Sequence, residues 1–364
     1  MDIKNFLADN EIFLFKKVGL VDKYNFYEYL AVLIDGGVSI SEAITSTSDK
    51  VRNQYFKKKI EELHTYLSSG DSLSRSMKKI PQVFESAEVA IIEAGESIWA
   101  VTASLFKLSE ELKKVHNLRL KIKWALTYPL IIFLFLLISV IIVLTYVIPA
   151  IKPLFATAEV ELPKATQALI FTSDFIQNNF LLIILFCFTC FIAFMAYKNT
   201  ERGKANLDYF LLGLPLVGTV YRNYILSNIA SNMGTLIGSG VGIIKALTLV
   251  SKTVDNLVYE TLFTAIIQKV STGEKITDAM REVDPQHLFF PPDYVQMLAV
   301  GERTASLEQV AKKINDQYTR EVDHALGNLT RWIEPLAILL AWVFVMWFAF
   351  AIFGAILKVT QTVG

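Results

Sequence analysis

Three long apolar stretches without a charged residue dominate the hydrophobic pattern of the chain. They lie between Lys123 and Lys152, between Asp174 and Lys198, and between Glu334 and Lys358. Each is long enough to cross roughly 30 Å of hydrocarbon at about 1.5 Å per helical residue. Because lipid offers no hydrogen bonds to the backbone, each is predicted to be helical. We therefore expect transmembrane helices at residues 124–148, 180–197 and 334–357.

The more polar segments also show helical periodicity and no strand-like alternation of useful length. Before the first apolar stretch, apolar residues recur mostly four and three positions apart, at Val101, Leu105, Leu108, Leu112, Val115 and Ile122. This amphipathic pattern meets no helix breaker, which predicts one helix continuing into the membrane. Ser39 to Glu42 has the form of a capping box after a turn at Gly36 and Gly37. Gly70-Asp71 predicts a helix stop followed by an N-cap.

The chain contains an internal repeat. Residues 33–44 match residues 236–247 in hydrophobic pattern and at one glycine. The further pairs keep the same order in both halves: Ser69-Gly70-Asp71 with Thr272-Gly273-Glu274, Met77 with Met280, Gly95-Glu96 with Gly301-Glu302, and Tyr128-Pro129 with Glu334-Pro335. Each copy ends in a helix leaving the same side of the membrane. The second apolar stretch is thus the return helix that a parallel duplication requires.

Basic residues orient the spans. They gather before the first span, after the second and before the third, whereas residues 149–179 contain only Lys152 and Lys164. By the positive-inside rule, the regions rich in lysine and arginine face the cytoplasm. The first residues of the chain also lack the pattern of a signal peptide, so we expect the N-terminus to be cytoplasmic and the C-terminus periplasmic.

The predicted fold class is all-α, an integral membrane protein with two homologous cytoplasmic bundles of about six helices each and three transmembrane helices. The predicted domains are an N-terminal segment (1–22), a first cytoplasmic bundle (23–123), transmembrane helix 1 (124–148), a short periplasmic loop (149–179), transmembrane helix 2 (180–197), a second cytoplasmic bundle (198–333), transmembrane helix 3 (334–357) and a periplasmic tail (358–364).

Composition and motifs argue against nucleic-acid binding, metal binding and the common kinds of enzyme catalysis. The 35 basic and 35 acidic residues cancel, so charge does not indicate a nucleic-acid partner. No phosphate-binding loop, zinc-protease motif or nucleophile elbow occurs, and no two histidines have the spacing of metal ligands on one helix face. Cys187 and Cys190 have redox spacing but lie in an uncharged span, where apolar packing is the favoured explanation. We expect no enzyme activity, cofactor or metal.

The ordered, duplicated set of features resembles the inner-membrane platform family of type II secretion systems and type IV pilus assembly machines. It comprises the leucine-rich turn, the Gly-Glu pair and the proline at the start of a span, and it covers the chain from about Asn25. Two departures are evident: the family's second glycine after Gly-Glu is absent at Ser97-Ile98-Trp99 and Arg303-Thr304-Ala305, and only Pro129 follows a tyrosine. We favour a type IV pilus system.

The resemblance implies a scaffold that couples a cytoplasmic hexameric assembly ATPase to extraction and polymerisation of pilin or pseudopilin subunits. It also implies inner-membrane accessory assembly proteins as partners and a homo-oligomeric state. An oligomeric channel or transporter is the alternative function. Against it, transport pathways usually place ionisable residues inside the membrane, and the three stretches have none.

Candidate partner contacts are Asp35, Gly37, Glu96 and Glu302. For the two glutamates the alternative is structural and is favoured: the glycine ends one helix and the glutamate lies in the first turn of the next. Pro129 and Pro335 are candidate hinges at membrane entry, because proline inside a continuing helix produces a kink.

Overall fold

The computed structural model describes residues 18–156 and 163–363, and all regular elements in these two ranges are helices. The chain divides into two compact units. Unit 1 contains residues up to Leu120 together with Val220–Val322, and unit 2 contains Lys121–Thr219 and the residues from Asp323 onward. Most of the predicted N-terminal segment, residues 1–17, lies outside the described residues, as do residues 157–162 of the predicted periplasmic loop.

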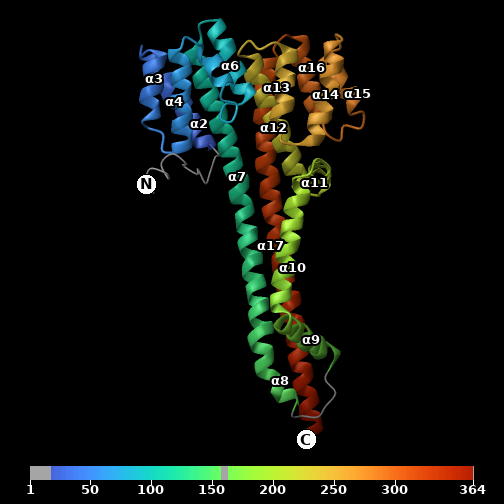
Figure 1. The fold of residues 1–364 in the computed structure, drawn as a ribbon. Coiled ribbons are helices and arrows are strands. Elements are labelled where there is room, and N and C mark those ends of the chain that lie inside the picture. The colour runs from blue at the N-terminus through green and yellow to red at the C-terminus, as the bar shows by residue number, and fades with distance from the viewer. Residues whose placement is uncertain (1–17, 157–162, 364) are drawn as a thin grey trace, which may run out of the picture. The chain divides into compact units, whose positions relative to one another are not determined.

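The first copy contributes five short helices and the start of a long one to unit 1 (Figure 1). These are α2 (Leu20–Asp35), α3 (Ile40–Ser48), α4 (Gln54–Ser68), α5 (Leu73–Lys78), α6 (Ser86–Ser97) and α7 (Val101–Ile142). Three aromatic rings, Phe26, Phe56 and Phe84, pack edge-to-face or tilted in its core, with centroids 5.5 to 6.1 Å from that of Phe26. Such pairs add to the stability that apolar burial provides.

The second copy repeats this order, as Figure 1 shows in yellow, orange and red. Its helices are α12 (Val217–Ile237), α13 (Ile243–Thr253), α14 (Leu257–Ser271), α15 (Ile276–Val283), α16 (Pro292–Arg303) and α17 (Leu307–Val363). Tyr259, Phe263, Phe290 and Tyr294 form its aromatic core, all fully or almost fully buried. The expected all-α fold, with about six helices per copy, is confirmed in the described part of the chain.

Three turns occur at corresponding places in both copies, and each needs a residue with positive φ. The first pair is Gly37 and Gly240 (φ +84° and +87°), and the second is Gly70 and Gly273 (φ +96° and +98°). Glycine is the default there because it has no Cβ. The third pair, Trp99 (φ 56°) and Ala305 (φ 53°), has side chains instead.

Of the two predicted N-caps, the one at Ser39 is confirmed, and the one expected at Asp71 lies one residue later in the structure. The Ser39 side chain accepts a hydrogen bond from the Glu42 N–H, as an N-cap does, and Gly37 forms the preceding turn. The stop at Gly70 is also confirmed. The N-cap that follows is Ser72, however, rather than Asp71, because the Ser72 hydroxyl is the group that accepts from the Arg75 N–H. Asp71 instead pairs with Lys79 at 2.5 Å.

The two copies contact each other within unit 1. Helix α6 packs against α13, and Lys245 pairs with Glu93 at 2.8 Å. A second ion pair, between Lys107 and Glu308 at 3.2 Å, joins the N-terminal parts of α7 and α17. Both ion pairs are partly exposed and therefore contribute little to stability. The short-helix parts of the two copies thus contact each other within unit 1.

Unit 2 carries the membrane-spanning stretches. Three helices are long and apolar enough to cross a membrane, within Val101–Pro153, Phe180–Lys198 and Leu307–Gly354. The expected span at 180–197 corresponds to α10 (Phe180–Lys198), in which no residue is buried. The predicted continuity of the soluble and membrane helices is confirmed, because α7 is unbroken from Val101 to Ile142. Helix α11 (Glu201–Gly213) follows α10 and belongs to unit 2.

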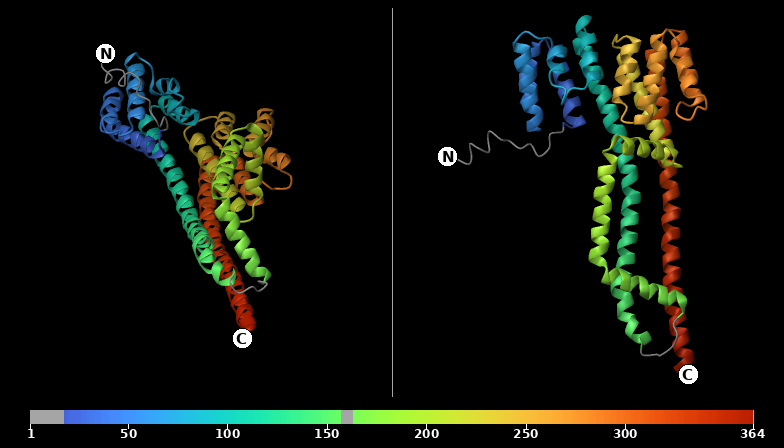
Figure 2. Two further views of the ribbon diagram at one scale, coloured as in Figure 1. Left: turned by 60° about the horizontal axis from the view of Figure 1, so that its bottom comes forward. Right: turned by 45° about the vertical axis from the view of Figure 1, so that its right-hand side comes forward.

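The segment between the first two spans is largely helical. Helix α7 passes into a π-helical turn, η1 (Val143–Val147), which is followed by α8 (Ile148–Ala156) and α9 (Lys164–Asn178). One face of α9 is buried through Leu169 against Leu144, Ile148 and Ala351. In Figure 2, α9 crosses near the ends of α7 and α17.

Two side chains of α9 hydrogen-bond to backbone carbonyls of the neighbouring helices. The Thr166 hydroxyl donates to the Ala351 carbonyl of α17 at 2.5 Å, and the Ser173 hydroxyl donates to the Leu144 carbonyl in η1. A π-helical turn alters the regular bonding pattern of the backbone, so its carbonyls are natural acceptors for such side chains. Helix α9 is therefore bonded to both same-direction spans.

Candidate functional site

Glu96 lies at the C-terminal end of α6, and its carboxylate reaches the first turn of α5. It accepts a hydrogen bond from the Ser74 N–H at 3.2 Å and another from the Ser74 hydroxyl. The first N–H groups of a helix have no partner within the helix, so a carboxylate there satisfies them and interacts favourably with the helix dipole. Glu96 thus joins α6 to α5.

Glu302 has the same role in the second copy. Its carboxylate accepts from the Ile276 N–H at 2.6 Å, the Thr277 N–H at 3.3 Å and the Thr277 hydroxyl at 2.7 Å. These groups form the first turn of α15, and Glu302 is near the end of α16. Both glutamates are only half-buried. Duplication has therefore preserved a specific capping contact.

The glycines before these glutamates allow close helix packing. A Cβ on Gly95 would approach the Ser104 Cβ to 2.8 Å, and one on Gly301 would approach the Val310 Cβ to 2.9 Å. Real Cβ atoms do not come so close. In both copies, the glycine permits the helix to pack against the long helix that follows it.

The structural explanation expected for Gly-Glu was therefore wrong in its details. Neither glycine ends a helix, since α6 continues to Ser97 and α16 to Arg303. Neither glutamate lies in the first turn of the next helix. Each caps the preceding short helix instead, because the chain folds back and brings the end of α6 or α16 to the start of α5 or α15. Sequence spacing alone does not reveal this long-range contact.

Asp35 and Gly37 lie together at the turn after α2, and both are exposed. Gly37 provides the positive φ that the turn needs, and its N–H donates to the Ile34 carbonyl. Asp35 ends α2 and makes no side-chain hydrogen bond or ion pair with another described residue. Asp35 is thus available to a partner in a way that the two capping glutamates are not.

Pro129 and Pro335 both lie inside continuous helices, α7 and α17. Pro129 is buried and Pro335 is exposed, so the surroundings of the two prolines differ although their sequence positions correspond. Each removes one backbone hydrogen bond from its helix. The structure shows where the prolines lie, and their role as hinges stays a prediction.

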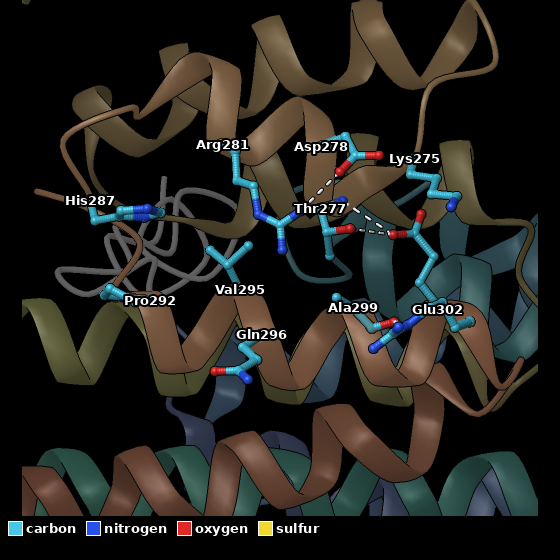
Figure 3. Close-up of a pocket in the computed structure, with 11 residues that line it drawn as sticks. Lys275, Thr277, Asp278, Arg281, His287, Pro292, Val295, Gln296, Ala299 and Glu302 are labelled. Atoms are coloured by element: carbon cyan, nitrogen blue, oxygen red, sulfur yellow. Dashed lines mark hydrogen bonds and ion pairs between the residues drawn. The ribbon is translucent and has the colours of Figure 1, made fainter.

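A cavity of about 530 Å³ lies in the second copy beside Glu302 (Figure 3). Its walls come from α15, α16 and the connection between them, with the residues Lys275, Thr277, Asp278, Arg281, His287, Pro292, Val295, Gln296, Ala299, Glu302 and Arg303. Arg281 is paired with Asp278 at 3.0 Å, and the Glu302 carboxylate is occupied by its capping bonds. With Lys275, Arg281 and Arg303 against Asp278 and Glu302, the lining carries a small excess of positive charge.

Sequence reasoning did not identify this cavity. The signal that was available is the difference between the copies. On α16 the lining residues Gln296, Ala299 and Arg303 correspond in the repeat to Ala90, Glu93 and Ser97 of α6. Comparing the polar residues of the two copies, and not only their shared motifs, would have marked this face of the second copy.

The first copy contains a buried charged cluster that sequence reasoning also missed. Lys23 of α2 pairs with Glu88 of α6 at 2.8 Å, and the Tyr27 hydroxyl donates to Glu88 at 2.8 Å. Lys23 and Glu88 are 5% and 3% exposed. Burial raises the pKa of the Glu88 carboxyl above its usual range, although the nearby Lys23 charge opposes this shift. Tyr294 takes the place of Glu88 in the second copy.

Cys187 and Cys190 are free and exposed on α10, within an apolar span. Within residues 18–156 and 163–363, no three His, Cys, Asp or Glu side chains are placed to share a metal ion.

Comparison with known proteins identifies a family model and several relatives. A family model described as type II secretion system (T2SS), protein F matches residues 26–149 and, a second time, residues 229–355. Each match contains one soluble bundle and one same-direction span, which confirms the internal repeat. The type IV pilus assembly protein PilC of Thermus thermophilus is 30% identical over 345 residues, covering 94% of this chain and 84% of that protein.

Two relatives from Pseudomonas aeruginosa come from both kinds of machine. Its type IV pilus assembly protein PilC is 29% identical over 350 residues, covering 96% of this chain and 92% of that protein. Its type II secretion system protein F is 26% identical over 335 residues, covering 92% of this chain and 82% of the relative.

Proposed function

Because this chain belongs to the type II secretion system protein F family, we propose that it is the non-enzymatic inner-membrane platform of a type IV pilus or type II secretion machine. In this role it couples a cytoplasmic assembly ATPase to extraction and polymerisation of pilin or pseudopilin subunits. The observation that carries the proposal is the duplicated bundle-plus-span, matched twice by the family model over most of the chain.

The proposed topology places unit 1 in the cytoplasm, with the N-terminus cytoplasmic and the C-terminus periplasmic. Clusters of lysine and arginine flank the three spans on one side only, which supports this orientation. Helices α8 and α9 then face the periplasm, and α10 returns the chain to the cytoplasm.

Labelling of single cysteines tests this topology. In a variant whose Cys187 and Cys190 are replaced by alanine, Lys164→Cys should react with a membrane-impermeant maleimide in intact spheroplasts, and Lys204→Cys should react only after lysis. Because Lys164 begins α9 and Lys204 lies in α11, the two positions flank the α10 span. The reverse labelling pattern would refute the orientation.

The proposed partners are the hexameric ATPase, pilin or pseudopilin subunits, inner-membrane accessory assembly proteins and further copies of this chain. A platform and its motor act in one step, so deleting this gene or the gene of the partner ATPase should abolish the same surface fibres or the same secretion. The test compares the two deletions with a strain complemented by the wild-type gene. Normal assembly without this protein would overturn the proposal.

Of the predicted contact residues, Asp35 is the one we propose as a partner contact, since its side chain is exposed and unengaged by the described residues. The capping bonds of Glu96 and Glu302 support structural roles for these two. We further propose that Pro129 and Pro335 allow each long helix to bend where its uncharged stretch begins. Pro129→Ala and Pro335→Ala should then reduce fibre assembly while leaving membrane insertion intact.

A further inference from the structure

Helix α11 exposes two adjacent aromatic rings. It follows the α10 span after only two residues, Asn199 and Thr200, and among the described helices it packs mainly against α10. Tyr209 and Phe210 are 65% and 61% exposed. A contiguous apolar surface of this kind marks a site of contact with a protein, a ligand or a membrane.

The start of α11 is held tightly against the end of α10. A Cβ on Gly203 would come within 2.8 Å of the Tyr197 carbonyl carbon, so only glycine permits the approach. The Thr200 hydroxyl caps α11 by accepting from the Gly203 N–H at 3.0 Å, and the Asn206 amide donates to the Tyr197 hydroxyl at 3.0 Å. The chain therefore turns sharply, and in the right-hand view of Figure 2 α11 runs across the end of α10.

These contacts identify the face of α11 that is turned toward the membrane. With 3.6 residues per turn, Phe210 shares a face with Gly203 and Asn206, which lie seven and four positions earlier and contact the end of α10. Phe210 thus lies on the side of α11 that faces the span. The seven residues from Gly203 to Phe210 rise about 10 Å, which places the ring beyond the radius of α10, about 5 to 6 Å.

The length of α10 sets the depth of α11. With its 19 residues, α10 is about 28 Å long, which matches a hydrocarbon core of about 30 Å. No residue of α10 is buried, so its side chains are left to lipid. A helix that folds directly across the end of such a span lies in the headgroup layer, at the edge of the hydrocarbon.

The side chains around this turn suit that depth. Tyr197 and Tyr209 are of a type enriched at membrane interfaces, because the ring is apolar and the hydroxyl is polar. Lys198 and Arg202 are exposed and long enough to reach lipid phosphates. Residues 198–213 contain three basic and two acidic residues. Charge therefore adds little, and the apolar contact carries the inference.

A soluble protein fits this surface less well. It would approach α11 from the side away from the membrane, and that side does not carry Phe210. The ring instead faces the layer in which α10 presents its own side chains to lipid.

We propose that α11 is an interfacial helix, with the Phe210 ring inserted among the lipids of the membrane that α10 crosses. The partner is thus a lipid surface. Interfacial helices bury their apolar side about 5 to 10 Å into the boundary between headgroups and acyl chains. The inference does not depend on which machine the protein serves or on which side of the membrane α11 lies.

The test measures contact between position 210 and lipid in the full-length protein. Cys187→Ala and Cys190→Ala remove the native thiols, and Phe210→Cys is labelled with an NBD fluorophore. The protein is placed in phosphatidylcholine nanodiscs with or without lipid carrying a doxyl quencher at carbon 5. The doxyl lipid should lower the fluorescence about twofold, because the fluorophore and the quencher lie at similar depth. Ala205→Cys, on the opposite side of α11, is the matched control and should be quenched much less.

A second comparison tests the geometry that sets the depth. Gly203→Ala in the protein labelled at position 210 should reduce the quenching, because the added Cβ clashes with the Tyr197 carbonyl and moves α11 off the end of α10. Gly213→Ala is the control, since no atom lies within 4 Å of its added Cβ. Equal quenching in the two glycine variants would contradict the role given to Gly203.

Two results at position 210 would overturn the inference. Quenching by iodide but not by doxyl lipid would place the ring in water. Protection from both quenchers would show that protein covers the helix. Either result would leave the platform function intact.

Discussion

The Thr277 hydroxyl and N–H both donate to the carboxylate of Glu302, at 2.7 and 3.3 Å. Ser74 donates to Glu96 through the same two groups in the first copy. A glutamate near the end of one helix thus fixes the start of another in each half of the molecule. The contact explains why Gly-Glu occurs twice without requiring that both copies bind the same partner.

Removal of either capping carboxylate should destabilise its own copy. We expect Glu96→Ala and Glu302→Ala each to lower the free energy of unfolding by about 1 to 2 kcal/mol, as loss of an N-cap does. Hydrogen exchange on the full-length protein in detergent should show faster exchange in α5 for the first variant and in α15 for the second. Unchanged protection in both helices would contradict the capping role.

Alanine at the paired glycines should disturb helix packing. Gly95→Ala and Gly301→Ala each place a Cβ within 3 Å of a neighbouring side chain, so we expect a loss of about 1 to 3 kcal/mol from overpacking. Gly327→Ala is the matched control, because this glycine lies inside α17 with no atom near the added Cβ. Thermal unfolding should show a small gain for the control, since alanine favours the helix.

The buried Lys23–Glu88 pair should make the stability of the first copy depend on pH. Burial raises the pKa of Glu88, so folding favours its protonated form. Its contribution is fully present below the unfolded pKa, about 4.3, and is lost as the pH rises through the higher folded pKa.

The measurement is hydrogen exchange of α2 and α6 in wild type and Glu88→Gln, from pH 5 to pH 8. Relative to the glutamine variant, the wild type should gain protection as the pH falls. Tyr27→Phe, which removes one donor to Glu88, should lower stability by about 1 kcal/mol. A wild-type gain on raising the pH would contradict the predicted sign.

The side-chain bonds of α9 should stabilise unit 2. Ser173→Ala and Thr166→Val remove the donors to Leu144 and Ala351, and each should cost about 0.5 to 1.5 kcal/mol. Thr172→Val is the control, because the Thr172 hydroxyl bonds only to the Ala168 carbonyl of its own helix. Equal thermal stability of the two test variants and the control would count against a tethering role for α9.

The helical class, the repeat and the spans could be predicted because each depends on local pattern. The apolar run from Phe180 to Tyr197 predicts α10 to within one residue, and the duplicated glycines mark the turns at Gly37 and Gly240. The N-cap after Gly70 was displaced by one residue, because Asp71 and Ser72 are both good caps and only the three-dimensional contacts decide between them.

The site was harder to predict because its contacts are distant in sequence. Glu96 and Ser74 are 22 residues apart, and Lys23 and Glu88 are 65 apart. Helix α9 falls in the segment 149–179 that the sequence analysis predicts as a loop, although Leu169, Ser173 and Ile176 have helical spacing on one face. Trp99 lies in the region where the family's second glycine is absent, and its left-handed backbone and exposed ring become visible only in the structure.

Helix α9 has a consequence for how force could pass through the spans. It bonds to η1 at Leu144 and to α17 at Ala351, near the C-terminal ends of the two uncharged stretches. Because α9 joins the two spans near one end, a change in the angle between them moves their other ends farthest. Pro129 and Pro335 lie at those other ends. A displacement applied near Pro129 and Pro335 would therefore turn the two spans about α9 and change their separation near Leu144 and Ala351 only slightly.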